Sequence, residues 1–202
     1  MEHKINSAIF KPIRNKTVVA IGGKMYSGKS TVADIIRVDM EIFSKIQAKI
    51  TPAAARLKRL VNDYYGLTDE EALQVKELLR KDYQYLGTEV VRNNYIDDFW
   101  IVLALRDPCK CAIFDDIRFV NEYETVEAHA TKLISIWVDA SKKVRKERCE
   151  SLGREFLDSK KHNHASEAFT GKEDFWQYRI KNNDNDHKKL SKRLEPIIKK
   201  LL

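Results

Sequence analysis

One run of eight residues in the sequence has a composition and spacing that suit the binding of phosphate, Gly23-Lys24-Met25-Tyr26-Ser27-Gly28-Lys29-Ser30. The run fits the phosphate-binding pattern GxxxxGK followed by Ser or Thr. It lies between a β-branched, apolar segment, 17–21, and a segment with the apolar spacing of a helix, 31–36. A loop in that position aims backbone N–H groups and the positive end of the helix dipole at a bound phosphate. The run, extended to Thr31, therefore predicts a nucleotide-binding loop.

Individual residues of this phosphate loop have separate expected roles. Gly23 and Gly28 permit tight turns and a close approach of the backbone to a ligand. Lys29 is expected to reach the β- and γ-phosphates of ATP as a catalytic residue, and the Ser30 hydroxyl to bind Mg²⁺. The alternative is a glycine-rich turn that binds nothing, but the strand and helix patterns on both sides argue against it.

Two acidic residues, Asp115 and Asp116, follow the short apolar segment 111–114. Strand-end carboxylates face the ligand crevice of open α/β sheets, where they hold Mg²⁺ or orient a substrate hydroxyl. We assign Asp116, with Ser30, to the metal, and we expect Arg118 to add a cation on the same rim. The alternative is an acidic cap for the following helix, which is compatible with function.

Three polar residues, Gln84, Thr88 and Arg92, are spaced four apart, so on a helix they share one face. An amide, a hydroxyl and a guanidinium together suit a phosphate monoester and its neighbouring sugar or base, with Arg92 as the bidentate clamp. A solvated helix face is the alternative, although such a face more often carries Glu and Lys. We therefore expect an acceptor-binding helix.

Three arginines, Arg145, Arg148 and Arg154, lead into a polar segment, 150–170, that lacks a sustained period and is predicted to be a lid. Phosphoryl transfer between two anions needs cations over the transferring group, and arginines on a closing lid supply them while excluding water. We expect Arg145 and Arg148 to be catalytic and Arg154 to bind substrate. Taken singly, each arginine would more often be a surface charge than a catalytic residue, so the prediction rests on the three together.

Two further sets allow a functional and a structural interpretation. Cys149, His162 and His164 could bind zinc, but three ligands without a Cys-x-x-Cys or paired-His scaffold argue against a structural zinc site. Trp100 could stack on a base of the acceptor, although an aromatic residue in an apolar helical run more often belongs to the core. We keep Trp100 as a candidate substrate contact.

Composition limits the class of protein. The chain has 202 residues, of which 43% are hydrophobic, enough for one large domain with a sizeable core. A formal net charge of +7 is typical of proteins that handle polyanions. The three cysteines offer no even-numbered disulfide framework, and the sequence has neither a signal-peptide pattern nor an apolar run long enough for a bilayer. We expect a protein of the reducing cytoplasm, without a membrane partner.

Strand-like and helix-like segments alternate along the chain. Strand patterns occur over 17–21, 45–50, 111–114, 132–138 and, more weakly, 178–181. A long helical stretch, 51–105, separates the second strand from the third, and Thr68 with Glu71 fits a capping box inside it. A basic helix follows from about Asp186. The alternation predicts an α/β fold whose parallel sheet has about five strands joined by right-handed crossovers.

Taken together, the motifs resemble one family, the bacteriophage-type deoxynucleoside monophosphate kinases of the adenylate-kinase-like group of P-loop phosphotransferases. Besides the phosphate loop, the resemblance is carried by Leu57-Lys58 before Tyr65-Gly66, Gln84-Tyr85-Leu86-Gly87-Thr88-Glu89 with Arg92, Asp116-Ile117-Arg118-Phe119 with Asn121-Glu122, His164-Ala165-Ser166-Glu167 and Ile180-Lys181-Asn182-Asn183. The phosphate loop is common to many NTPases, whereas the combination of Gln-x-Leu-Gly-Thr-Glu with Asp-x-Arg-Phe is much narrower. The chain departs from the family at 51–56, where an aromatic-led stretch ending in proline is typical.

The resemblance implies a three-layer α/β/α P-loop kinase core in a single domain, 1–202, with a helical acceptor-binding insertion over 51–105 and a lid region over 141–170. It implies transfer of the γ-phosphate of ATP, with Mg²⁺, to a deoxynucleoside monophosphate, giving the diphosphate. Small-molecule nucleotides would be the partners, with no stable nucleic-acid partner. The residues implied to face the acceptor are Lys58, Gln84, Thr88, Arg92, Asp116 and Arg118.

Other functions fit part of the sequence. A P-loop kinase of another small phosphorylated acceptor, such as phosphomevalonate or dephospho-coenzyme A, shares the core and differs mainly in segment 51–105. A nucleotide switch or a nucleic-acid-binding protein gains some support from the basic C-terminal helix, but such a helix is usually a solvated face. A GTPase switch needs an Asn-Lys-x-Asp motif, which the chain lacks. The sequence leaves the preferred base and the oligomeric state open, a homodimer included.

Overall fold

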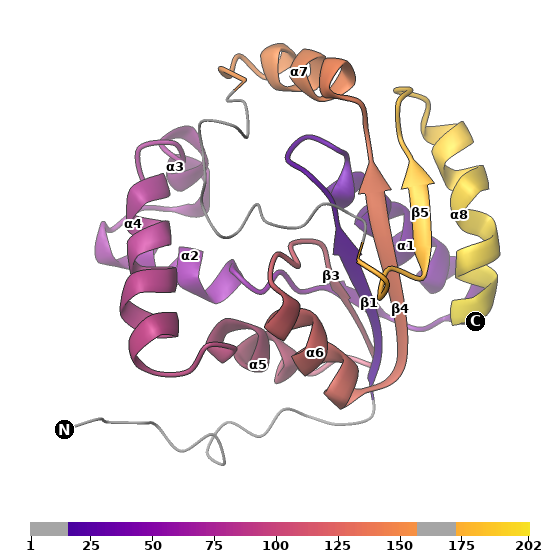
Figure 1. Ribbon diagram of the computed structural model, residues 1–202, viewed down its shortest axis with the longest axis horizontal. Coiled ribbons are helices and arrows are strands. Elements are labelled where there is room, and N and C mark those ends of the chain that lie inside the picture. The colour runs from indigo at the N-terminus through magenta and orange to yellow at the C-terminus, as the bar shows by residue number, and fades with distance from the viewer. Residues whose placement is uncertain (1–15, 157–172) are drawn as a thin grey trace.

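A parallel β-sheet forms the centre of the computed structural model, which describes residues 16–156 and 173–202. Within these residues the sheet has five strands in the order β2-β3-β1-β4-β5 (Figure 1). The strands are β1 Lys16–Gly22, β2 Ala48–Ile50, β3 Cys111–Phe114, β4 Ala130–Asp139 and β5 Tyr178–Lys181. The predicted α/β class and parallel sheet are therefore confirmed. β2 starts later than predicted because the preceding helix continues through Ser44 and Lys45 adopts a left-handed φ of 55°.

Helices cover both faces of the sheet and make the three predicted layers. Figure 1 shows α1, Lys29–Ser44, and α8, His187–Leu201, on one side, with α5, Phe99–Leu105, and α6, Val120–His129, on the other. Side chains of β1 alternate between the two cores. Val19 and Ile21 belong to the core under α1 and α8, whereas Val18 and Ala20 belong to the core under α5 and α6. This double burial explains why β1 is apolar without a polar face.

The stretch between β2 and β3 has a small core of its own. It contains α2, Ala55–Tyr64; α3, Asp69–Gln74; α4, Arg80–Gln84; the π-helical segment η2, Tyr85–Arg92; and α5. Leu57, Val61, Ala72, Leu79 and Trp100 are its buried members. The predicted capping box is present, because the Glu71 amide donates to Thr68 Oγ1 at 3.2 Å and the Thr68 amide donates to Glu71 Oε2 at 2.8 Å.

The segment after β4 is described in part. Its helix α7, Lys142–Ser151, lies at the carboxyl end of the sheet (Figure 1). His162, His164 and the motif over 164–167 lie outside the described residues, as does most of the lid predicted over 141–170. Among the helices that the structure does describe, none is long and apolar enough to cross a membrane.

The packing of α8 against the sheet gives a test of the fold. Leu194 of α8 is fully buried, whereas Leu60 of α2 is 52% exposed. Leu194→Ala should lower the free energy of unfolding by about 2–5 kcal/mol because it leaves a cavity in the core, and Leu60→Ala should change it by less than about 0.5 kcal/mol. Urea unfolding measures both values. Equal effects would contradict the docking of α8 on the sheet.

Candidate active site

The phosphate loop joins β1 to α1 in a conformation that requires glycine at two positions. Gly28 has a φ of 94°, and a Cβ there would lie 2.3 Å from Asn182 Nδ2. Gly23 has a φ of 152°, and a Cβ there would lie 2.5 Å from the Val138 carbonyl oxygen. A side chain at either position would clash with neighbouring strands, so the pattern in the sequence reflects a close approach of backbones.

Two side chains from distant segments support the loop from behind. Asn182, just after β5, is buried and donates from Nδ2 to the Ser27 carbonyl at 2.9 Å. Arg148 of α7 donates from Nη1 to the carbonyls of Tyr26 and Ser27 at 3.3 and 3.2 Å. Arg148 also bonds to Asn185 and to the Asp184 carbonyl. These contacts give Arg148 a part in holding the loop in position, and the catalytic role expected from the sequence stays a prediction.

The inner side of the loop fits a phosphate group. Ser27 Oγ is buried and has no hydrogen-bond partner among the described residues. The ammonium group of Lys29 donates to the carbonyls of Gly23 and Lys24 at 2.8 and 3.1 Å, so it lies over the loop mouth. An orphaned hydroxyl and a cation at a helix N-terminus are groups that anionic oxygens satisfy. The loop is therefore suited to the phosphates of a nucleotide.

The carboxylate beside the phosphate loop is Asp115, not Asp116. Ser30 Oγ donates to Asp115 Oδ2 at 2.7 Å, and this hydroxyl and carboxylate are oxygen ligands of the kind that Mg²⁺ prefers. Asp116 instead accepts from the amides of Ala53 and Ala54 at 2.8 and 3.1 Å, ahead of α2. Burial is the main reason that the pKa of Asp116 is raised, and the neighbouring Asp115 adds to it. Successive side chains after a strand point to opposite sides, so only one of the two can face the loop.

Cations from four separate segments gather near the same edge. Lys76, in the turn after α3, is partly buried, and its pKa is lowered by that burial first and then by Lys58, Arg154 and Arg118, while Glu77 opposes the shift. Lys58, Arg118 and Arg154 were expected to meet at a substrate. Lys76 was not expected, because it lies in a short turn without a motif. We call Lys58, Lys76, Arg118 and Arg154 the cation cluster, and several positive charges near one another suit an anionic ligand.

The phosphate loop is tied to the cation cluster through Tyr26. Its pKa is raised, mainly by burial and then by a hydrogen bond with Cys149, whereas the hydrogen bond with Arg154 lowers it. Tyr26 thereby holds Arg154 close to the loop. Cys149 is buried, and its Sγ contacts the Arg154 carbonyl at 3.5 Å. No group of three or more metal-binding side chains occurs among the described residues, which do not include the two histidines of the zinc hypothesis.

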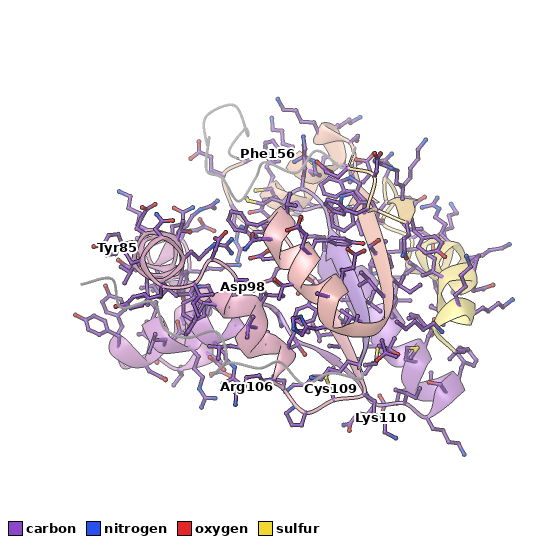
Figure 2. All side chains as sticks on the ribbon, turned by 60° about the horizontal axis from the view of Figure 1, so that its bottom comes forward. Tyr85, Asp98, Arg106, Cys109, Lys110 and Phe156 are labelled. Atoms are coloured by element: carbon purple, nitrogen blue, oxygen red, sulfur yellow. The ribbon has the colours of Figure 1, made fainter. Side chains whose placement is uncertain are left out.

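The other arginine expected to be catalytic, Arg145, lies at the start of α7. It donates from Nε to the Ala140 carbonyl at 3.3 Å, and its guanidinium lies 5.6 Å from the centre of the Phe156 ring. Figure 2 places Phe156 near α7. A further cation that the sequence did not single out, Arg80 of α4, contacts the phosphate loop, with Nη2 3.7 Å from Met25 Sδ. The helical insertion therefore reaches across to the donor loop.

The Arg92 side chain is buried and is bound by other groups of the protein. Its buried guanidinium donates to Glu122 Oε1 and Asn121 Oδ1, each at 2.9 Å, pairs with Asp97 at 3.0 Å, and stacks on the Phe119 ring at 3.9 Å. Burial raises the pKa of Glu122 to about 7, although hydrogen bonds from the Arg118 and Phe119 amides oppose the shift. The expectation that Arg92 clamps the acceptor is thus replaced by a buried link between the insertion and α6.

Gln84, Thr88 and Arg92 do not share the helical face that was expected from their four-residue spacing. Residues 85–92 form a π-helix, whose wider turn removes the four-residue spacing that places side chains on one face. Gln84, which precedes this segment, and Thr88, which lies in its first turn, are both partly buried. Asp98, after this segment, faces α6, where Thr125 Oγ1 donates to its carboxylate at 3.0 Å (Figure 2).

Trp100 belongs to the core of the insertion. It is 6% exposed, packs among the buried residues of that core, and donates from Nε1 to the Gly87 carbonyl at 3.0 Å. A buried indole whose N–H is already paired has no face left for a base. The structure therefore places Trp100 in the core of the insertion, against the expectation of a substrate contact.

Comparison with known proteins identifies the fold. No protein-family model and no curated protein matches the sequence. Shikimate kinase from Bacteroides thetaiotaomicron is similar in structure, with a TM-score of 0.52 and 12% identity over 91% of this chain and 98% of that chain. The Mycobacterium tuberculosis APS kinase, solved with AMPPNP and APS, has a TM-score of 0.47 and 13% identity over 93% of this chain and 99% of that chain. The chain has the fold of the P-loop kinases. That the chain belongs to the bacteriophage-type deoxynucleoside monophosphate kinases stays a prediction.

The buried Arg92 network can be tested by stability. Arg92→Ala should lower the free energy of unfolding by about 3–5 kcal/mol, because it leaves Glu122 buried without its partner. Arg37→Ala, which removes an exposed arginine paired only along α1, should cost less than about 1 kcal/mol. Urea unfolding measures both. An unchanged stability with a raised Michaelis constant for the acceptor would restore Arg92 to the substrate site.

Proposed function

We propose that this protein is an ATP-dependent kinase that transfers the γ-phosphoryl group to a deoxynucleoside monophosphate. The observation that carries the proposal is the cation cluster beside the phosphate loop, because it offers a second anion site next to the first. A kinase whose acceptor is neutral has no need of such a cluster. An acceptor that already bears a phosphate does, since two anions must approach each other for transfer.

The donor half of the site is the phosphate loop. Its backbone, Ser27 and Lys29 would hold the phosphates of ATP, and Ser30 with Asp115 would hold Mg²⁺. The bound metal ion would supply charge neutralisation on the phosphate oxygens. Arg148 and Asn182 keep the loop in shape by occupying its outward carbonyls. Their contribution is therefore preorganisation, which lowers the cost of binding the donor.

The acceptor half is the cation cluster. Lys58 and Lys76 come from two segments of the insertion, Arg118 follows β3, and Arg154 follows α7, so binding an acceptor phosphate would draw four segments together. The nucleophile is a phosphate oxygen that is already ionised, so no strong general base is required. Positioning and charge neutralisation then supply most of the rate enhancement.

Kinases of phosphomevalonate or dephospho-coenzyme A remain the second candidates, because their acceptors also carry a phosphate and the cation cluster favours them equally. The nucleotide reading rests in addition on the resemblance of segments 84–89 and 116–119 to nucleotide kinases. Incubation with ATP, Mg²⁺ and each acceptor in turn, with ADP formation as the readout, decides between them. Phosphorylation of another acceptor and of no deoxynucleoside monophosphate would refute the nucleotide proposal.

The acceptor role of the cluster gives one prediction. Lys76→Met should raise the Michaelis constant for the acceptor by about tenfold or more and that for ATP by less than about twofold, because it removes a charge-assisted contact to one substrate only. The matched control is Lys81→Met, at an exposed lysine of α4. Steady-state kinetics with each substrate varied gives both constants. Equal increases for the two substrates would remove Lys76 from the acceptor site.

The metal assignment gives another prediction. Asp115→Asn should lower kcat by about 100-fold or more and raise the Mg²⁺ concentration needed for half-maximal rate, because the metal loses a charged ligand. Asp116→Asn keeps an oxygen for only one of the two amides of Ala53 and Ala54, so it should lower stability, but it should leave the Mg²⁺ requirement unchanged. Rates measured over a range of Mg²⁺ concentrations separate the two. A shifted requirement in Asp116→Asn alone would return the metal to Asp116.

A further inference from the structure

Lys16, at the start of β1, is a buried lysine that the proposed reaction does not use. It is 2% exposed, and its ammonium donates to the carbonyls of Leu105, at 2.7 Å, and Asp107. The carboxylate of Asp107 is paired with other cations, with Lys49 at 2.9 Å and with Arg56 at 2.7 Å. Backbone carbonyls therefore hold the ammonium of Lys16 in place.

The third neighbour of this ammonium is a thiol. Lys16 Nζ lies 3.8 Å from Cys109 Sγ, although the two residues are 93 positions apart in the sequence. Cys109 lies in the turn between α5 and β3, and Figure 2 shows it beside Lys110 at the edge where β3 begins. The flexible lysine stem lets the nitrogen approach the sulfur further without a change of the backbone. A nucleophilic nitrogen and an oxidisable sulfur are thus neighbours.

Cys109 is the one cysteine of the three that solvent reaches. It is partly buried, whereas Cys111 and Cys149 are fully buried. Burial, with Cys109 as a smaller cause, raises the pKa of Cys111 to about 12, so that residue stays a thiol at neutral pH. Reactive cysteines lie in partly exposed, electropositive surroundings. Lys16 and the exposed Lys110 give Cys109 such surroundings.

We propose that Cys109 is oxidised by hydroperoxides and that Lys16 captures the oxidised sulfur in a covalent nitrogen–sulfur link. In the first step the sulfur attacks hydrogen peroxide, the O–O bond breaks, and a sulfenic acid and water form. The sulfur loses two electrons and the peroxide gains them. The structure supplies neither the peroxide nor a second thiol in contact with Cys109, so the oxidant comes from solution and the capturing group is the amine.

The second step needs no further oxidant. The Lys16 ammonium releases one proton to solvent, and its nitrogen attacks the sulfenic sulfur. The N–S bond forms, the S–O bond breaks, and the departing hydroxide takes a proton from nitrogen and leaves as water. The product is a sulfenamide, a known fate of sulfenic acids beside a nitrogen. The two steps together remove two hydrogens from the protein.

The link would protect Cys109 from irreversible damage. A sulfenic acid that is not captured is oxidised further to sulfinic and sulfonic acids. An added thiol reopens the sulfenamide by attacking its sulfur, which releases the amine and leaves a mixed disulfide that a second thiol reduces. The pair lies at the amino ends of β1 and β3, whereas the phosphate loop follows the carboxyl end of β1. The inference is therefore independent of the proposed function.

Hydrogen peroxide treatment of the folded full chain, followed by intact-mass measurement and peptide mapping, tests the proposal. The wild-type protein should lose about 2 Da and yield a peptide pair that joins Lys16 to Cys109, and dithiothreitol should restore the original mass. Lys16→Arg keeps a cation for the two carbonyls but removes the amine. Its Cys109 should instead gain about 16 Da or more and react with dimedone, a reagent for sulfenic acids.

The other cysteines provide the controls. Cys111→Ala removes the neighbouring thiol and should leave the link unchanged, whereas Cys109→Ser should abolish it. A peptide joining Cys109 to Cys111, or to a second chain, would be a disulfide and would overturn the proposal. A loss of about 2 Da in Lys16→Arg would do the same. So would an unmodified Cys109 at a peroxide concentration that oxidises free cysteine.

Discussion

Close contact between the phosphate loop and the strands behind it is the constraint on which the rest of the site depends. Gly28 packs against the Asn182 amide so tightly that a Cβ would meet it at 2.3 Å, and the same amide donates to the Ser27 carbonyl. β1 lies in the middle of the sheet, between β3 and β4, and the loop that follows it packs against the ends of β4 and β5. Its outward carbonyls are occupied by protein, which leaves the inner side with Lys29 and an unpaired hydroxyl for the ligand.

Two carboxylates outside the helical insertion, the partly buried Asp116 and the buried Glu122, join the insertion to this core. Asp116 accepts from the amides that precede α2, and Glu122 pairs with Arg92 at the end of η2. Both pKa values are raised by burial, so holding these groups in place costs desolvation that their hydrogen bonds offset. The arrangement fixes where the insertion meets the sheet, and hence where Lys58 and Lys76 lie relative to the phosphate loop.

The proposed active site therefore has two halves. The donor half is a loop held by hydrogen bonds, and the acceptor half is assembled from several segments. The donor loop is held by hydrogen bonds from α7 and from the residue after β5. The acceptor side is a set of cations from the insertion, from the residues after β3 and from the residues after α7, and Tyr26 links the two halves through Arg154. In such a design the substrate completes the site, which is a means of coupling binding to catalysis.

The class of fold and the donor loop could be predicted from the sequence alone, because the hydrophobic period, the glycine spacing and the lysine and serine that follow are local properties. The sequence placed five strands and the capping box correctly, and it pointed to three members of the cation cluster. Only the tertiary structure decided that Asp115 rather than Asp116 faces Ser30, that Arg92 and Trp100 are buried, and that Lys76 lies among the other cations. Those outcomes depend on which side of a strand end a carboxylate points, on a π-helical turn, and on contacts between distant segments. None of these is encoded in a short run of residues.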